Sequence, residues 1–114
     1  MATLNSQRIV EAGLIPTLTN LEASNDFINT GYQFIFYRNS SGVSKTVTVT
    51  AQVTTIESNI YGDLTKSDAV KVVANGTYVM IGPFSVDTFN DDDGKCTFAI
   101  TPFSEADEAA ILYL

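Results

Sequence analysis

The sequence contains no histidine and no tryptophan, and it has a single cysteine, Cys96. Without histidine a serine triad cannot form, histidine metal sites are excluded, and the commonest general base is missing. A single cysteine excludes an intrachain disulfide and a thiolate metal cage. Cys96 alternates with Phe98 and Ile100 in KCTFAIT, so we predict a small buried hydrophobe and not a reactive thiol.

Basic residues are also scarce. Six Lys and Arg stand against thirteen Asp and Glu, which gives a formal net charge of −7 over 114 residues. This charge repels phosphate backbones, and the basic residues are scattered along the chain, so we expect no nucleic-acid partner. No apolar run approaches the ~20 residues of a membrane span, and the first residues lack the basic and apolar blocks of a signal peptide. We therefore expect a soluble protein that is made in a cytoplasm and has no membrane partner.

The glycines stand in isolated turns, so the sequence has no glycine-rich loop of the kind that binds phosphate. Because a nucleophile with an adjacent base is also missing, we predict that the protein is not an enzyme. The same reasoning predicts no catalytic residues and no cofactor. The function would then depend on the surfaces of the protein.

What the sequence does have is an alternation of apolar and polar residues with a period of two. In VSKTVTVTAQV (43–53) valines share one face and threonines the other, which is typical of a half-buried strand. The turn-forming stretches NSSG (39–42) and ANG (74–76) separate such runs and predict hairpins. The pattern predicts an all-β chain, a single-domain β-sandwich or jelly-roll-like barrel of about seven short antiparallel strands over residues 14–114. Residues 55–68 show no sustained period and predict a long loop.

The N-terminal segment differs from the rest of the chain. Residues 1–13 contain one apolar pair, Ile9 and Val10, between polar residues. Because one pair is too little to bury as an independent strand of the core, we predict an N-terminal arm that is mobile until it is bound. Ile9 and Val10 are the candidate partner-binding residues, and the arm would add backbone hydrogen bonds to an exposed strand edge of the partner.

The stretch that most resembles a metal site is FNDDDGK, in which three carboxylates precede a glycine. An EF-hand loop takes oxygen ligands from positions 1, 3, 5 and 12 and has glycine at position 6. With Gly94 at position 6, positions 1 and 12 fall on Phe89 and Ile100, which cannot bind a metal. We therefore predict a turn in which a side chain bonds back to the backbone, and no metal site. Asp91 and Asp93 remain weak candidates for a calcium contact.

Five stretches of the chain follow one another in an informative order. They are ATLNSQRIVEAGLIPTL (2–18), GYQFIFYRNSSGVSKTVTVTA (31–51), VVANGTYVMIGPF (72–84), FNDDDGKCTFAIT (89–101) and AAILYL (109–114). In this order they resemble the small capsid decoration, or cement, proteins of tailed bacteriophages. The similarity covers nearly the whole chain. The long, acidic FNDDDG turn and the TTIESNIYGDLTK loop depart from the pattern.

The resemblance implies a virion structural protein on the capsid surface, synthesised in the host cytoplasm. Such proteins bind between major capsid protein subunits and hold them together, often as homotrimers at local threefold positions. The doubly apolar YQFIFYRN strand and the apolar AAILYL end also favour a homo-oligomer, whose interface the sequence does not identify. Two alternatives stay open. One is another phage head-fibre, neck or tail accessory module, and the other is a carbohydrate-binding β-sandwich with exposed aromatic residues and calcium at Asp91 and Asp93.

Overall fold

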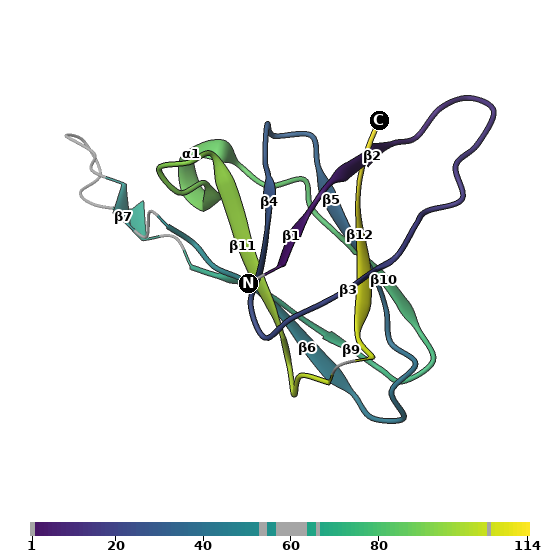
Figure 1. Ribbon diagram of the computed structural model, residues 1–114. Helices are drawn as coiled ribbons and strands as arrows, with labels where there is room; N and C mark the ends of the chain where they lie inside the picture. The colour runs from purple at the N-terminus through teal and green to yellow at the C-terminus, as the bar shows by residue number, and fades with distance from the viewer. Residues whose placement is uncertain (1, 53–54, 57–63, 66, 105) are drawn as a thin grey trace.

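The computed structural model describes residues 2–52, 55–56, 64–65, 67–104 and 106–114 (Figure 1). Within these residues the chain is all-β, as predicted, with one helix of four residues. In chain order the elements are β1 (Ala2–Leu4), β2 (Ser6–Arg8), β3 (Thr19–Asn20), β4 (Asn25–Ile28), β5 (Phe34–Arg38), β6 (Lys45–Val49), β7 (Thr55–Ile56), β8 (Leu64–Thr65), β9 (Ala69–Val73), β10 (Tyr78–Ile81), α1 (Val86–Phe89), β11 (Lys95–Thr101) and β12 (Glu108–Tyr113).

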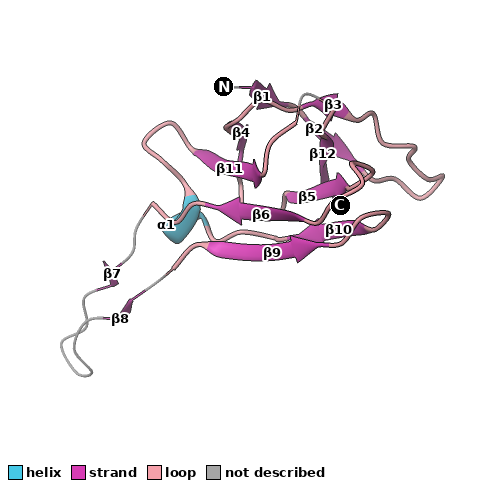
Figure 2. Cartoon of the chain, turned by 90° about the horizontal axis from the view of Figure 1, so that it is seen from below, coloured by secondary structure: helices cyan, strands magenta, loops and turns pink. Residues whose placement is uncertain are grey.

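Most of the strands form two sheets (Figures 1 and 2). The first sheet has the order β1-β4-β11-β6-β9, and the second has the order β10-β5-β12-β2, with β3 also pairing with β12. Among the described strands, seven have four or more residues, and all pairs between them are antiparallel. The short strands behave differently, because β1 pairs with β4 and β2 pairs with β12 in parallel. The sheets are therefore mixed: the predicted antiparallel pairing holds among the seven longer strands and fails for β1 and β2.

The two sheets share one hydrophobic core. Strand alternation buries Val47 and Phe98 from the first sheet and Ile35 from the second, and all three belong to one cluster. The rings of Phe27 and Phe98 lie 6.0 Å apart in this cluster. Cys96 is fully buried there, so the prediction that it is a small buried hydrophobe is confirmed.

The hairpins predicted at NSSG and ANG are wrong, because each turn carries the chain from one sheet to the other. β5 and β10 belong to the second sheet, whereas β6 and β9 belong to the first. The fully buried Asn39 holds the two turns together, since its Nδ2 donates to the carbonyl oxygens of Val43 and Val73 at 2.8 Å each. The N–H of Gly42 donates to Asn75 Oδ1 at 2.9 Å. Turn residues specify a bend in the chain, but the bend does not determine which strands pair.

The N-terminal residues pair with both sheets, and no separate arm is seen over residues 2–9. β1 lies on β4 of the first sheet and β2 on β12 of the second. Leu4 is 3% exposed in the core, and the Ile9 N–H donates to the Tyr113 carbonyl oxygen at 2.7 Å. The predicted division into an arm (1–13) and a domain (14–114) is therefore corrected. A strand needs only backbone partners and one buried anchor, and here the anchor is Leu4, not Ile9 and Val10.

The strands at the ends of the two strand orders follow one another along the chain, two by two. β1 and β2 follow one another and join the sheets along one side, while β9 and β10 follow one another at the opposite ends of the two strand orders. The loop predicted over residues 55–68 falls mainly outside the described residues. Within it, β7 and β8 pair antiparallel and lie away from the two sheets (Figure 2).

Candidate functional site

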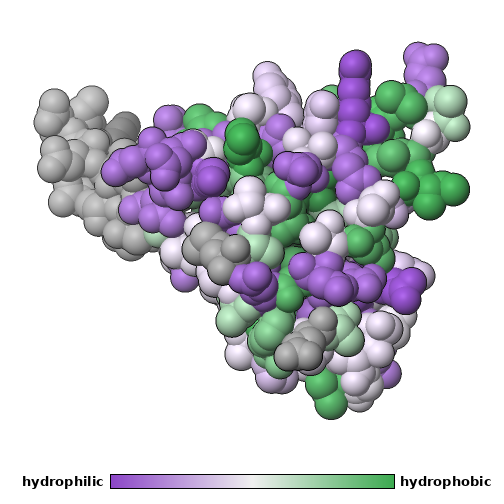
Figure 3. All heavy atoms as spheres, in the orientation of Figure 1, coloured by the Kyte–Doolittle hydropathy of each residue, from purple (hydrophilic) through white to green (hydrophobic). Residues whose placement is uncertain are grey.

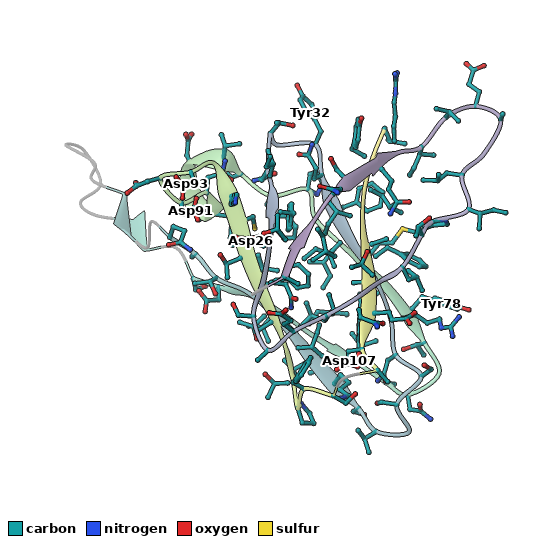
Figure 4. The ribbon with its side chains drawn as sticks, viewed as in Figure 1. Asp26, Tyr32, Tyr78, Asp91, Asp93 and Asp107 are labelled. Carbon is teal, nitrogen blue, oxygen red and sulfur yellow. The ribbon has the colours of Figure 1, made fainter. Side chains whose placement is uncertain are left out.

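The acidic stretch forms a turn between α1 and β11, with Asp91 and Asp93 beside each other (Figure 4). Asp91 Oδ1 accepts the N–H of Asp93 at 2.9 Å and the N–H of Lys95 at 3.0 Å. Gly94 has φ +75°, a conformation that favours glycine, and its N–H donates to the Asp91 carbonyl oxygen at 3.1 Å. The predicted turn, with a side chain bonded back to the backbone, is thus formed.

Within the part of the chain that the structure describes, no three acidic, histidine or cysteine side chains are grouped to hold a metal ion. That the turn needs no metal stays a prediction. Replacing both Asp91 and Asp93 with asparagine keeps an oxygen acceptor at each position. We expect the melting temperature to change by less than about 3 °C, with or without a chelator. The exposed Asp92, replaced by asparagine, is the matched control. A calcium-dependent rise of several degrees in the wild type, absent from the double variant, would contradict the prediction.

Cys96 does not supply a nucleophile. Burial, and in second place the nearby Asp91 carboxylate, raises the pKa of the Cys96 thiol to about 12. The side chain is therefore a protonated thiol at neutral pH, and the thiolate is the nucleophilic form of cysteine. Cys96 belongs to the core and not to a reactive site.

A network of buried charged and polar side chains joins the two sheets, at a place where the sequence suggested no site. Lys45 Nζ lies 3.3 Å from Asp107 Oδ2, and each of the two side chains is 3% exposed. The Tyr37 hydroxyl donates to Asp107 Oδ1 at 3.0 Å, and the Ser104 N–H donates to Asp107 Oδ2 at 2.9 Å. Lys45 also donates to the carbonyl oxygen of Pro102. The ion pair thereby ties β6 of the first sheet to the residue that precedes β12 of the second.

This buried network stabilises the fold through its hydrogen bonds and its ion pair. Burial, followed by the hydrogen bond to Asp107 and the charge of that residue, raises the pKa of the Tyr37 hydroxyl well above its usual value. Tyr37 therefore remains protonated and continues to donate. Among the described residues no buried side-chain nitrogen or oxygen lacks a partner.

A surface pocket beside the N-terminal strands is lined by uncharged residues (Thr3, Leu4, Asn5, Gln7, Thr17 and Thr19). These residues offer no group for acid–base catalysis.

The loop between β2 and β3, which we call loop 9–18, projects from the sheets (Figure 1). Apolar side chains gather over it in the space-filling view (Figure 3). Gln7 fastens its far end, because Gln7 Oε1 accepts the Thr17 N–H at 2.9 Å and Gln7 Nε2 donates to the Thr17 carbonyl oxygen at 2.8 Å. Ile15, held in this fastened loop, is 93% exposed.

The two residues predicted to contact a partner both lie at the start of loop 9–18. Val10 is 47% exposed, whereas Ile9 is half-buried beside the end of β12. Val10 is therefore the more accessible of the two, and their contact with a partner stays a prediction. Sequence reasoning overlooked Ile15, although GLIPTL around Pro16 was a signal, since an apolar run interrupted by proline does not form a central strand.

A second apolar surface lies on β5 and β10. Tyr78 and Met80 are 63% and 64% exposed, and the ring of Tyr78 stacks on Phe36 with centroids 5.7 Å apart. In contrast, Ile111 and Leu112 of the apolar C-terminal strand are buried within the chain. Of the AAILYL segment only Leu114 is well exposed, at 83%, so most of this segment is already buried in its own chain and the homo-oligomer stays a prediction.

The features expected of a calcium-assisted carbohydrate site do not come together. Tyr32 and Tyr78, both well exposed, lie on different parts of the surface, and Tyr78 is on the side of the molecule away from Asp91 and Asp93 (Figure 4). An aromatic platform and a carboxylate pair would have to meet at one sugar. Among the described residues these two features are separate, and the carbohydrate-binding alternative stays a prediction.

Comparison with protein-family models, with curated proteins and with solved structures found no match. Across the described ranges, no helix combines the length and apolar character needed to cross a membrane. What the structure defines is an all-β chain of two mixed sheets, with its ionisable network buried and two apolar surfaces accessible.

Proposed function

We propose that the protein is a virion structural protein that decorates and stabilises a tailed-phage capsid by binding between major capsid protein subunits. The observation that carries the proposal is loop 9–18, in which Ile15 is almost fully in solvent, Val10 is exposed and Leu14 and Leu18 are half-buried. Apolar residues gathered on a projecting loop point to a surface that a partner covers. The class of partner comes from the sequence resemblance.

Four carboxylates of the described residues have their oxygens engaged within the fold, which supports a binding role. Asp107 and Asp91 are occupied by the hydrogen bonds described above, and Asp26 Oδ1 accepts the hydroxyl of Thr3 at 2.6 Å. Asp68 Oδ1 accepts the Ala51 N–H at 2.8 Å. These four carboxylates stabilise the fold. A carboxylate that acts as a general acid or base must instead be free to exchange a proton with the substrate.

The finer features of the proposal follow from the same reasoning. We infer a β-sandwich, with a jelly-roll-like barrel as the alternative, because both sheets contribute to one core. The homotrimer and the location on the capsid surface come from the resemblance. The net charge of −7 favours a protein partner over a nucleic acid. A head-fibre, neck or tail accessory role would use the same loop on another particle component.

The test is replacement of Ile15 by serine. Because full burial of an isoleucine side chain contributes about 1.5–3 kcal/mol, we expect binding to undecorated heads to weaken about 10- to 100-fold. The heads would be assembled from a major capsid protein encoded beside this chain, and binding would be measured by co-sedimentation. Circular dichroism should show an unchanged fold, since Ile15 lies in solvent.

Val43→Ser is the matched control. Val43 is 54% exposed in the connection between β5 and β6, outside loop 9–18, and its replacement should leave head binding unchanged. Failure of the wild-type chain to bind such heads would overturn the proposed function. Binding to purified tails or necks, and not to heads, would support the accessory alternative.

A further inference from the structure

β10 is an unpaired edge of the second sheet with an uncommon composition. It pairs with β5 on one side, and no other strand in the described part of the chain pairs with it. At the other ends of the strand orders, β9 carries the exposed Lys71 and β2 the exposed Arg8, and charged residues of this kind discourage edge-to-edge pairing. β3, which pairs with β12, has only two residues. β1 has three residues and no exposed apolar side chain. β10, with the sequence YVMI, has no such guard.

The phase of the β5–β10 ladder determines which backbone groups of β10 point outward. The Asn39 N–H donates to the Thr77 carbonyl oxygen at 3.0 Å, and hydrogen-bonded pairs alternate along an antiparallel ladder. Counting along β10 from Thr77, we infer that Val79 and Ile81 bond to β5. The N–H and C=O groups of Tyr78 and Met80 then point away from the sheet. The same two residues have the exposed side chains, so Tyr78 and Met80 present backbone and side chain together.

The charge distribution favours a second copy of the chain as the occupant of this edge. Residues 72–86 contain no charged side chain, which makes them the longest uncharged stretch of a chain whose net charge is −7. Two copies repel one another over most approaches, because like charges oppose contact. β10 itself carries no charge; across the strand pair Tyr78 lies opposite Arg38, which on its other side lies opposite Glu108 of β12. An equally acidic copy can therefore approach here without meeting carboxylates on β10.

We propose that β10 of one copy pairs antiparallel with β10 of a second copy about a twofold axis at Val79. In this register Tyr78 lies opposite Met80 of the partner subunit, and Met80 opposite Tyr78 of the partner subunit. The outward N–H and C=O groups of both residues then form four backbone hydrogen bonds. Opposite residues share a face, so each methionine sulfur meets a tyrosine ring, a favourable contact. β10 ends at Ile81, just before Gly82. Position 82 requires glycine, because a Cβ there would lie 2.9 Å from the Phe34 Cβ.

The proposal goes beyond capsid decoration and is measured on the purified chain alone. The contact is small, so we expect reversible dimers that appear between about 10 μM and 1 mM in sedimentation equilibrium. A twofold contact can join copies that belong to different trimers, so it does not require the trimer to be absent. Head binding by the Ile15 variant and self-association through β10 are measured in different experiments, so either proposal can fail without the other.

Met80→Pro tests the backbone bonds. Proline removes one N–H, and at this position that N–H faces outward, where an edge strand tolerates proline. We expect the dissociation constant of the dimer to rise at least about tenfold, while Met80→Ala, which keeps the N–H, should lose much less. Wild-type chain that stays monomeric over the whole range would overturn the proposal. So would a twofold association, between monomers or between trimers, that Met80→Pro does not weaken.

A cross-link tests the register and does not depend on how well the proline variant folds. In the proposed pair Val79 faces Val79 of the partner subunit in a non-hydrogen-bonded position, where Cα atoms are about 4.5 Å apart, within disulfide range. Under mild oxidant, Val79→Cys should give covalent dimers. Ile81→Cys faces no copy of itself and should give few, and the buried Cys96 of the wild type should give none. Equal cross-linking of the two variants would overturn the register.

Discussion

Replacing Asp107 with alanine is expected to lower the free energy of unfolding by about 3–5 kcal/mol, the largest effect of any single substitution considered for this chain. The variant leaves Lys45, 2% exposed, as a buried charge without its carboxylate. The Tyr37 hydroxyl and the Ser104 N–H lose their acceptor at the same time. Urea denaturation followed by circular dichroism measures the loss.

Two comparisons separate the buried charge from other effects. Adding Lys45→Met to Asp107→Ala removes the unpaired ammonium, so the double variant should regain part of the stability lost by the single one. Asp92→Ala removes an exposed carboxylate and should change the free energy of unfolding by less than about 0.5 kcal/mol. If Asp107→Ala were no less stable than Asp92→Ala, the buried pair would not hold the sheets together.

Deletion of residues 2–8 is expected to prevent stable folding. Truncating Leu4 alone, which is 3% exposed, should cost about 2–5 kcal/mol. The deletion also removes both parallel ladders and leaves one edge of β4, and of β12 from Ile111 to Tyr113, without a partner. Since a domain is stable by only about 5–15 kcal/mol, little or no folded population should remain. Circular dichroism and urea denaturation of the truncated chain measure this directly.

Graded controls show whether the pairing or merely the truncation matters. Leu4→Ala should give an intermediate loss of stability, while Asn5→Ala, exposed between β1 and β2, should be close to neutral. A truncated chain that unfolds at the same urea concentration as the full chain would restore the interpretation of these residues as a separate arm.

The strands were predictable because a strand's alternation is a local property of the sequence. Val47 and Val49, two residues apart, both face the core as their period requires. The Asp91 turn was predictable for the same reason, since its side chain bonds to backbone groups within four residues. The burial of Cys96 was predictable because Cys96 and Phe98, two residues apart on one strand, face the same side.

The arrangement of the strands was not predictable from the same information. NSSG has the composition of a hairpin turn, but the crossing between sheets depends on Asn39 bonding to Val73, 34 residues along the chain. Lys45 offered a signal, because it has the phase of Val47 and Val49, and a lysine on an inward face requires a buried acceptor. That acceptor is Asp107, 62 residues away, and no local pattern identifies it. The exposure of Ile15 was not predictable either, because it depends on how the two sheets are arranged around loop 9–18.

The position of β12 has a consequence for how the chain is made. β12 lies between β5 and β2, although Ser6 of β2 and its partner Ile111 are separated by almost the whole sequence. A growing chain that has not reached residue 108 therefore exposes the edges of two strands that face each other across a missing one. Contacts this distant in sequence slow folding, and unpaired edges invite pairing with other chains. A ribosome that pauses upstream of β12 would hold the protein in its most aggregation-prone form.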